Sequence, residues 1–230
     1  MRVSIIIPVW GDPSYTDACL EHLTKNTTDY SLILVDNTGV YSVPECVGDN
    51  LAAIFRPKEN LGWSGGNNCG AKAAKTSDCL VFVNCDCEPE VNWLTELLTA
   101  FDDPEVAVAG ARLHYPDGRI QHSGISITRH PGGVAAHNRQ DEHGIEDVDG
   151  VTGACLAVRR SVFDELGGFD EGYWNGADDV DFCISVTERG YRIRYVSSSN
   201  LLHHESVTDN VERWRRVHEN VARLNSKWGL

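Results

Sequence analysis

Residues 79–89 read Cys79-Leu80-Val81-Phe82-Val83-Asn84-Cys85-Asp86-Cys87-Glu88-Pro89, and this stretch decides the fold. It begins as an apolar run rich in β-branched residues, typical of a strand buried on both faces. The run then turns polar and ends at Pro89, which cannot continue a central strand. Asp86 is therefore predicted just beyond the carboxyl end of a core strand, where open α/β sheets bind ligands. A carboxylate there either caps a loop or binds a cation, and this stretch alone leaves both interpretations open.

Composition and charge narrow the class of protein. The chain has 230 residues, of which 41% are hydrophobic and 23% charged, as expected for a globular protein with a substantial core. Its apolar runs are too short to cross a bilayer, and Met1-Arg2 leads directly into one of them, so we expect a cytoplasmic protein without a signal peptide. The formal net charge of −14 argues against binding a nucleic-acid backbone, which requires many Lys and Arg. A small anionic ligand held through a metal ion remains compatible with this charge.

The eight cysteines show no paired C-x-x-C spacing. Cys85-x-Cys87 could bind a soft metal, but it has no matching second pair of cysteines, so a metal site is the less favoured interpretation. We therefore expect buried free thiols.

Apolar strands and helical patterns alternate along the first half of the chain. Strands are predicted at residues 3–9, 31–37, 51–55, 79–83 and 106–113. Helices are predicted near residues 14–23, after a glycine-rich turn at residues 62–68, and at residues 93–101. Such alternation indicates a mostly parallel sheet with right-handed connections.

The pattern changes in the second half. Residues 129–149 contain glycines, acids and three histidines (His130, His137 and His143) but little apolar content, so we expect a long mobile loop over a site. A short helix at residues 161–166, a strand at 191–196 and an amphipathic helix at 211–228 follow.

Asp178, Asp179 and Asp181 crowd the predicted start of a helix that runs to about Arg189. The helix dipole favours carboxylates there, and capping alone is one interpretation of them. Crowding also raises carboxylate pKa values, so one of the three is a candidate general base.

Six blocks, in this order, resemble the inverting family-2 glycosyltransferases of the GT-A fold: Pro8-Val9-Trp10, Val35-Asp36-Asn37, residues 60–67, Asn84-Cys85-Asp86, residues 153–171 and Asp178-Asp179-Val180-Asp181. Residues 117–124, together with His203-His204-Glu205-Ser206, are similar to the rhamnosyltransferase-type members that build surface glycans. The resemblance covers nearly the whole chain.

The resemblance implies an α/β fold with a Rossmann-like, mostly parallel central sheet flanked by helices and a small antiparallel acceptor-side part. Residues 1–230 would form a single domain, with a nucleotide-binding half at 1–113 and an acceptor-side half at 114–230 that ends in a helix. The donor would be a nucleotide-diphosphate sugar, with a UDP-sugar favoured and dTDP-rhamnose as an alternative. The acceptor would be a glycan, a protein or a small molecule.

The family also implies Mn²⁺ or Mg²⁺ on the leaving diphosphate. Asp86 matches the last residue of its D-x-D motif and His203 its distal histidine ligand, with adjacent His204 as the alternative. Asn84 departs from the motif by replacing its first Asp. An amide can hydrogen-bond a ribose hydroxyl but is a poor ligand for a hard cation.

Asp179 aligns with the family's catalytic base, and Asp178 replaces the usual Glu before it. The same alignment implies that the nucleotide is contacted by Pro8, Val9, Trp10, Asp36, Asn60, Gly65, Gly66, Asn84, Gly153 and Ala154. Two rival functions remain: a non-catalytic module that binds nucleotide sugars or glycans, and a nucleotidyltransferase. The first would not need Asp179, and the second would release pyrophosphate. The oligomeric state is left open.

Overall fold

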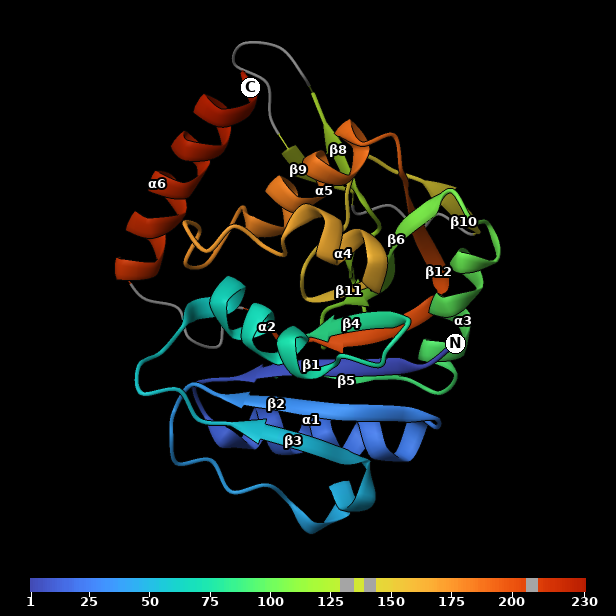
Figure 1. Cartoon of the computed structure of the whole chain (residues 1–230), viewed down its shortest axis with the longest axis vertical. Coiled ribbons are helices and arrows are strands. Elements are labelled where there is room, and N and C mark those ends of the chain that lie inside the picture. Colours follow the sequence, from blue (N-terminus) through green and yellow to red (C-terminus); the bar gives the residue numbers. More distant parts are fainter. Residues whose placement is uncertain (129–134, 139–143, 206–210) are drawn as a thin grey trace.

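A mixed β-sheet with helices on both faces forms the centre of the computed structural model, which describes residues 1–128, 135–138, 144–205 and 211–230 (Figure 1). The strand order is β10-β12-β6-β11-β4-β1-β2-β3, with β5 paired to β12 and β7 paired to β6. A separate two-stranded sheet joins β8 and β9. No helix of the described residues is both long and apolar enough to cross a membrane.

The first half forms the parallel part of the sheet. Its elements are β1 (Val3–Val9), α1 (Pro13–Asn26), β2 (Tyr30–Asp36), η1 (Glu45–Asn50), β3 (Leu51–Phe55), α2 (Gly62–Ala73) and β4 (Cys79–Val83). Val9 lies beside Asp36 and Ile6 beside Phe82, so β1, β2 and β4 end at the same edge. The apolar runs that predict these strands are buried throughout β1 and β4. This edge is where parallel sheets place ligands.

The second half adds antiparallel pairs. Its elements are β5 (Cys87–Pro89), α3 (Trp93–Leu98), η2 (Thr99–Asp102), β6 (Val106–His114), β7 (Ile120–His122), β8 (Ile125–Ile127), β9 (Ala135–His137), β10 (Ile145–Asp147), β11 (Cys155–Arg159), α4 (Arg160–Leu166), α5 (Asp178–Glu188), β12 (Arg192–His203) and α6 (Val211–Trp228). Strand β11 runs antiparallel to both β4 and β6, whereas β12 runs parallel to β6. The sheet is therefore mixed, as the predicted antiparallel part requires.

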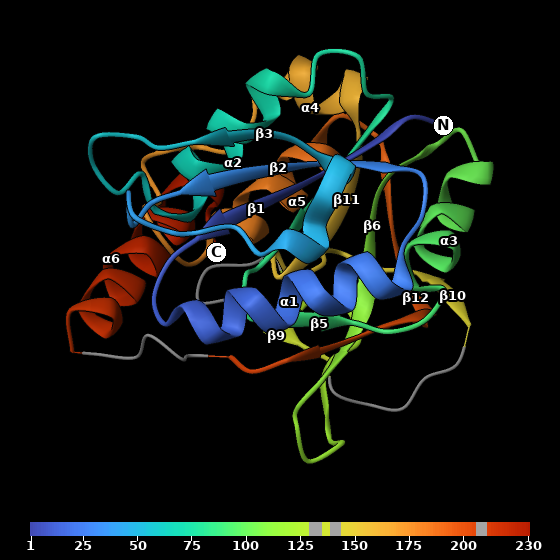
Figure 2. The same ribbon diagram turned by 90° about the horizontal axis from the view of Figure 1, so that it is seen from below.

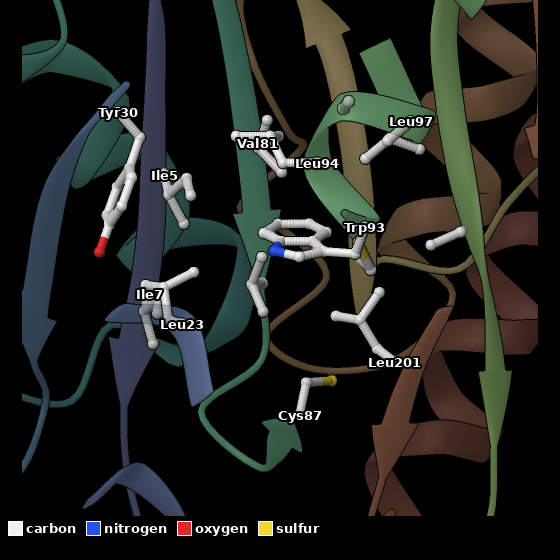
Figure 3. Close-up of a cluster of buried hydrophobic side chains, with 14 of the residues drawn as sticks. Ile5, Ile7, Leu23, Tyr30, Val81, Cys87, Trp93, Leu94, Leu97 and Leu201 are labelled. Atoms are coloured by element: carbon white, nitrogen blue, oxygen red, sulfur yellow. The ribbon is translucent and has the colours of Figure 1, made fainter. Parts of the chain in front are cut away.

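Alternate residues of the central strands feed two separate hydrophobic clusters, one on each face. Ile5 and Val81 face α1 and α3, while Ile6 and Phe82 face α2, α4 and α5 (Figure 2). On the first face, Trp93 is fully buried among aliphatic side chains, and its indole Nε1 donates a hydrogen bond to Thr27 Oγ1 at 2.7 Å (Figure 3). These two clusters fix the strand ends that carry the site.

The predicted glycine-rich turn at residues 62–68 is wrong, because α2 begins at Gly62 and contains both Gly65 and Gly66. The glycines serve close packing instead. A Cβ on Gly66 would lie 3.2 Å from Pro8 Cβ, and one on Gly70 would lie 2.4 Å from Ile6 Cγ2. Packing of α2 against β1 thus overrides the low helix propensity of glycine.

The predicted loop at residues 129–149 is also wrong in part. Residues 135–137 form β9, which pairs with β8, and residues 145–147 form β10, which pairs with β12. Residues 129–134 and 139–143, with His130 and His143, lie outside the described residues.

Candidate active site

A cavity of about 330 Å³ opens at the carboxyl ends of β1, β2 and β4. Residues from both halves of the chain line it. The residues that the sequence predicts for the site and that line the cavity are Pro8, Trp10, Asn60, Asn84, Asp86, Gly153, Ala154, Asp178, Asp179 and His203. The structure therefore brings the predicted metal ligands and the predicted base to one cavity.

Val9, Asp36, Gly65 and Gly66 are described residues that do not line this cavity. Asp36 is fully buried, and its carboxylate accepts hydrogen bonds from the backbone of Thr38 at 3.0 Å and of Tyr41 at 2.9 Å, and from Arg56 Nε at 3.1 Å. Burial alone would raise the pKa of Asp36, but these hydrogen bonds outweigh it and lower the pKa. Asp36 thus shapes the loop after β2.

The Asp86 carboxylate lies beside the side chain of His203, whereas His204 contacts Asp86 through its backbone, with its N–H donating to Asp86 O at 3.1 Å. His203 Nε2 is 3.3 Å from Asp86 Oδ1, and both residues are buried. His204 Nε2 instead lies 2.7 Å from Glu88 Oε1. Burial favours a raised pKa for Asp86, but His203, when both of its ring nitrogens are protonated, donates a hydrogen bond and carries a positive charge that together lower the pKa overall. Asp86 therefore remains a carboxylate and can serve as an anionic ligand.

The Asp86–His203 pair fits a divalent cation. One carboxylate oxygen and one imidazole nitrogen suit Mn²⁺, which accepts both kinds of ligand. Cys87 Sγ lies within 4.8 Å of both ligand atoms. Burial, however, raises the pKa of Cys87 well above the ordinary value, and its thiol donates to Ala154 O at 3.4 Å. Cys87 is therefore a neutral neighbour of the cation position, which leaves further coordination to a ligand such as a diphosphate.

Asn84 lines the cavity, and its side-chain oxygen is engaged by an indole. Asn84 Oδ1 accepts a hydrogen bond from Trp63 Nε1 at 2.8 Å. Gly153 makes room for the same indole, because a Cβ there would lie 2.4 Å from Trp63 Cζ2. Asn84 is thus oriented as a hydrogen-bond donor, in keeping with its replacement of a metal-binding Asp.

Asp178 and Asp179 begin α5 directly after Ala177, whose φ of 67° is unusual for a residue with a Cβ. Asp179 Oδ2 accepts a hydrogen bond from Gly153 N at 2.9 Å, and Oδ1 accepts one from Val180 N at 2.8 Å. These backbone donors hold the Asp179 side chain in a fixed position at the cavity.

Asp178 is more deeply buried. Its Oδ2 lies 3.0 Å from Ser64 Oγ, which also lies 2.9 Å from Tyr173 O. Ser64 has one hydroxyl proton and can donate to only one of these acceptors at a time. Burial and the neighbouring charge of Asp179 raise the pKa of Asp178 to about 7. Asp178 therefore takes up a proton more readily than an ordinary aspartate does.

Comparison of the sequence with protein families shows which family this chain belongs to. Residues 4–167 match a family described as "Glycosyl transferase family 2". The chain belongs to this family.

Proteins similar in sequence to this family-2 chain include the following three. It is 32% identical to the uncharacterized protein y4gI of Sinorhizobium fredii, over 98% of this chain and 27% of that protein. It is 30% identical to the O-antigen biosynthesis protein RfbC of Myxococcus xanthus, over 90% of this chain and 18% of that protein. Identity to the N-acetylglucosaminyl-diphospho-decaprenol L-rhamnosyltransferase of Mycobacterium tuberculosis is 26%, over 76% of this chain and 67% of that enzyme. The predicted resemblance to rhamnosyltransferases is confirmed, although the chain spans only about a quarter or less of the first two relatives.

Solved structures confirm the GT-A fold of the family-2 chain. A structure of GalNAc-T7 with UDP, GalNAc and Mn²⁺ superposes with a TM-score of 0.73 at 17% identity, over 98% of this chain and 47% of the other. A mannosyltransferase of Pyrobaculum calidifontis with GDP-Man and Mn²⁺ superposes with a TM-score of 0.69 at 18% identity, over 98% and 63%.

The raised pKa of Asp178 predicts a pH-dependent stability. Between the ordinary carboxyl pKa of 3.8 and about 7, folded Asp178 keeps a proton that the unfolded chain has released. Its contribution to the free energy of unfolding is therefore present at low pH and is lost as pH rises through this window. Asp178→Asn removes this dependence. We expect the stability of the variant relative to wild type to increase by up to roughly 1.4 kcal/mol per pH unit between these values.

Urea denaturation of both proteins at several pH values measures this difference. The difference should be constant above about pH 7, where Asp178 is ionised in both states. Stability curves that stay parallel from pH 4.5 to 7 would show that Asp178 is ionised throughout.

Asp181 holds α6 against α5 and is not exposed to the cavity. Its Oδ1 accepts hydrogen bonds from Trp228 Nε1 at 2.7 Å and Tyr173 Oη at 3.2 Å, and its Oδ2 pairs with Lys227 Nζ at 2.9 Å. Asn220 of α6 also donates to the carbonyls of Asn175 and Gly176, which line the cavity. The third acid of the block thus fastens the last helix beside the site.

Asp181→Ala is therefore expected to lower the free energy of unfolding by about 2 kcal/mol or more, because it leaves three donors unpaired. Mn²⁺-dependent nucleotide affinity should stay nearly unchanged. Thermal or urea unfolding and calorimetric binding of UDP measure the two effects. Unchanged stability together with lost transfer would instead place Asp181 in the chemistry.

Several cavity residues were not predicted from the sequence as site residues. They are Asn37, Gly62, Trp63, Cys85, Thr152, Trp174, Asn175, Gly176, Ala177 and Glu205. Asn37, Gly62, Trp63, Cys85 and Glu205 lie within stretches that carry the family resemblance, so a signal was present for these five. Trp174 was signalled only by its position four residues before Asp178.

Proposed function

We propose that this domain is an inverting glycosyltransferase that moves a sugar from a nucleotide-diphosphate donor to an acceptor hydroxyl. The observation that carries the proposal is the meeting of two chemically different groups in one cavity. A cation-compatible pair, Asp86 and His203, and a carboxylate pair, Asp178 and Asp179, both line it. A binding module needs no such base, which favours an enzyme.

Asp86 and His203 would hold Mn²⁺ or Mg²⁺, which neutralises charge on the diphosphate as it leaves. The amide nitrogen of Asn84 can donate a hydrogen bond to a donor hydroxyl, since its oxygen is engaged by Trp63. Trp10, which is 45% exposed, gives the cavity an aromatic wall beside the nucleotide.

Asp179 would act as the general base. As the acceptor oxygen bonds to the anomeric carbon, the bond from that carbon to the diphosphate breaks, and the acceptor proton moves to Asp179. Hydrogen bonds from Gly153 N and Val180 N keep the carboxylate in place during this transfer. Attack from the face opposite the leaving group inverts the anomeric configuration.

Membership of the family supports the proposed classes of donor and acceptor. A UDP-sugar is favoured and dTDP-rhamnose is the alternative, supported by neighbours solved with UDP or GDP-Man and by relatives named rhamnosyltransferases. The acceptor would be a glycan, a protein or a small molecule. Residues 1–113 would bind mainly the nucleotide, and residues 114–230 would supply the base and contact the acceptor.

Incubation of the protein with a panel of nucleotide sugars, with Mn²⁺ or with chelator, tests this function. Without an acceptor, slow hydrolysis of the donor should release a nucleoside diphosphate that ³¹P NMR detects. This release should occur only when the metal is present. In a parallel incubation with a sugar 1-phosphate and a nucleoside triphosphate, release of pyrophosphate would indicate a nucleotidyltransferase. Binding of a donor without turnover, with or without candidate acceptors, would indicate a binding module.

A further inference from the structure

The Gln121 side chain connects the histidine of the proposed cation site to the cavity wall. Gln121 lies in β7, is 5% exposed and does not line the cavity. Its Oε1 lies 2.6 Å from His203 Nδ1, and its Nε2 lies 3.2 Å from Glu205 Oε2 and 3.4 Å from His203 O. It thus contacts His203 on the side away from Asp86.

These contacts determine which nitrogen of His203 carries the proton. Both neighbours of Gln121 Nε2 are acceptors, a carboxylate and a carbonyl, so the amide nitrogen must face them. The amide oxygen therefore faces His203 Nδ1, and because that oxygen only accepts, Nδ1 must carry a hydrogen. In the neutral imidazole the lone pair is then on Nε2, which faces Asp86 Oδ1 at 3.3 Å.

Asp86 favours the opposite arrangement. A carboxylate beside Nε2 stabilises the tautomer in which Nε2 carries the hydrogen and donates it to Asp86. That tautomer has no lone pair for a cation between the two residues. Gln121 and Asp86 thus compete for the His203 proton, and the shorter contact is the one to Gln121.

We propose that Gln121 is a positioning residue that keeps the proton of His203 on Nδ1 and so presents the Nε2 lone pair to a divalent cation. This inference rests on the proposed function, because it assigns Gln121 a role in the same cation site. Glu205 supports the arrangement by orienting the Gln121 amide. Its backbone has a φ of 46°, a left-handed conformation that is uncommon for Glu.

Gln121→Leu removes the acceptor with little change in volume. Gln121→Glu keeps an acceptor oxygen for His203 Nδ1 at the same chain length, and its second oxygen carries a proton that it donates to Glu205, a protonation that burial and the Glu205 charge favour. In the metal-free protein, long-range ¹H–¹⁵N NMR correlations of the imidazole distinguish the two tautomers, and His203→Asn assigns the signals. We expect Nδ1–H in the wild type and in Gln121→Glu, and Nε2–H in Gln121→Leu. A wild-type Nε2–H tautomer, or an unchanged tautomer in Gln121→Leu, would overturn the proposal.

Mn²⁺ affinity without nucleotide, measured by the EPR signal of the free ion, gives a second readout. Gln121→Leu should weaken binding about 10-fold or more, as for other hydrogen-bond partners of metal-binding histidines, and Gln121→Glu should restore it. Thr27→Val serves as a control, since it removes a buried hydrogen bond to Trp93 remote from the cavity and should leave Mn²⁺ affinity unchanged.

The outcomes separate the two proposals. Wild-type protein that binds no Mn²⁺ would contradict the cation site of the proposed function. Wild-type protein that binds Mn²⁺ as tightly as Gln121→Leu does would contradict only the role of Gln121.

Discussion

Asp179→Asn is expected to lower sugar transfer by a factor of about 10² or more, because the amide cannot accept the proton of the acceptor hydroxyl. The substitution preserves the shape of the side chain, and its single oxygen can keep one of the two hydrogen bonds that Asp179 accepts from Gly153 N and Val180 N. Affinity for the nucleoside diphosphate in the presence of Mn²⁺ should therefore survive. Initial rates of transfer or donor hydrolysis, together with calorimetric binding, measure the two quantities separately.

Asp178→Asn is the matched comparison, because it changes the neighbouring acid, which has the raised pKa and contacts Ser64. It should reduce transfer less than Asp179→Asn does. If Asp179→Asn transfers at nearly the wild-type rate while Asp178→Asn is inactive, the roles of the two acids are reversed.

Asp86→Ala is expected to abolish Mn²⁺-dependent turnover and to weaken nucleoside diphosphate binding in the presence of Mn²⁺. The variant removes the anionic ligand of the cation position and leaves His203 without a carboxylate partner. With chelator present, wild type and variant should bind the nucleotide about equally weakly, because the difference between them depends on the cation.

His203→Asn and His204→Asn form a matched pair for the same site. The two residues are adjacent in the chain, but His203 faces Asp86 and His204 faces Glu88. Only His203→Asn should reduce the Mn²⁺ dependence of nucleotide binding. An equal effect of both substitutions would show a general loss of structure at the end of β12 and not the loss of a ligand.

The strands that position this site could be predicted from short, local patterns. The apolar runs of β1 and β4 are buried along their whole length, so their hydrophobicity reports their place in the sheet directly. Because parallel strands end at a common edge, Asp86 and the residues after β1 could be assigned to one region without any contact information. The matching of Asp86 and Asp179 to separate chemical roles came from the family resemblance.

Features set by packing between distant elements could not be predicted in this way. Helix α2 begins at Gly62, where a Cβ would lie 2.3 Å from Trp174 O, and it packs against β1 at Gly66 and Gly70. Local glycine content does not report either of these close approaches. Strand β12 extends beyond the predicted residue 196 to His203 because a register shift after Val196 allows pairing with β6 to resume at Asn200. The serines between these two residues carry no apolar signal, so the sequence marked the end of the strand too early.

The hydrogen-bond partners of buried polar side chains could not be predicted from the sequence either. Gln121 and His203 are 82 residues apart, and Asp181 and Trp228 are 47 apart. Nothing in the spacing of such residues indicates that they meet. For that reason Asp181 was grouped with the candidate bases, although its carboxylate anchors α6.

The anomeric configuration of the first product tests the central claim most directly. The protein is incubated with Mn²⁺ and a nucleotide sugar that it accepts as donor. ¹H NMR during the first minutes, before free sugar mutarotates, can identify the anomer of the sugar that is hydrolysed from the donor or linked to an acceptor. Direct displacement assisted by Asp179 predicts the anomer opposite to that of the donor. A first-formed product with the donor's own configuration would contradict an inverting site built on Asp179.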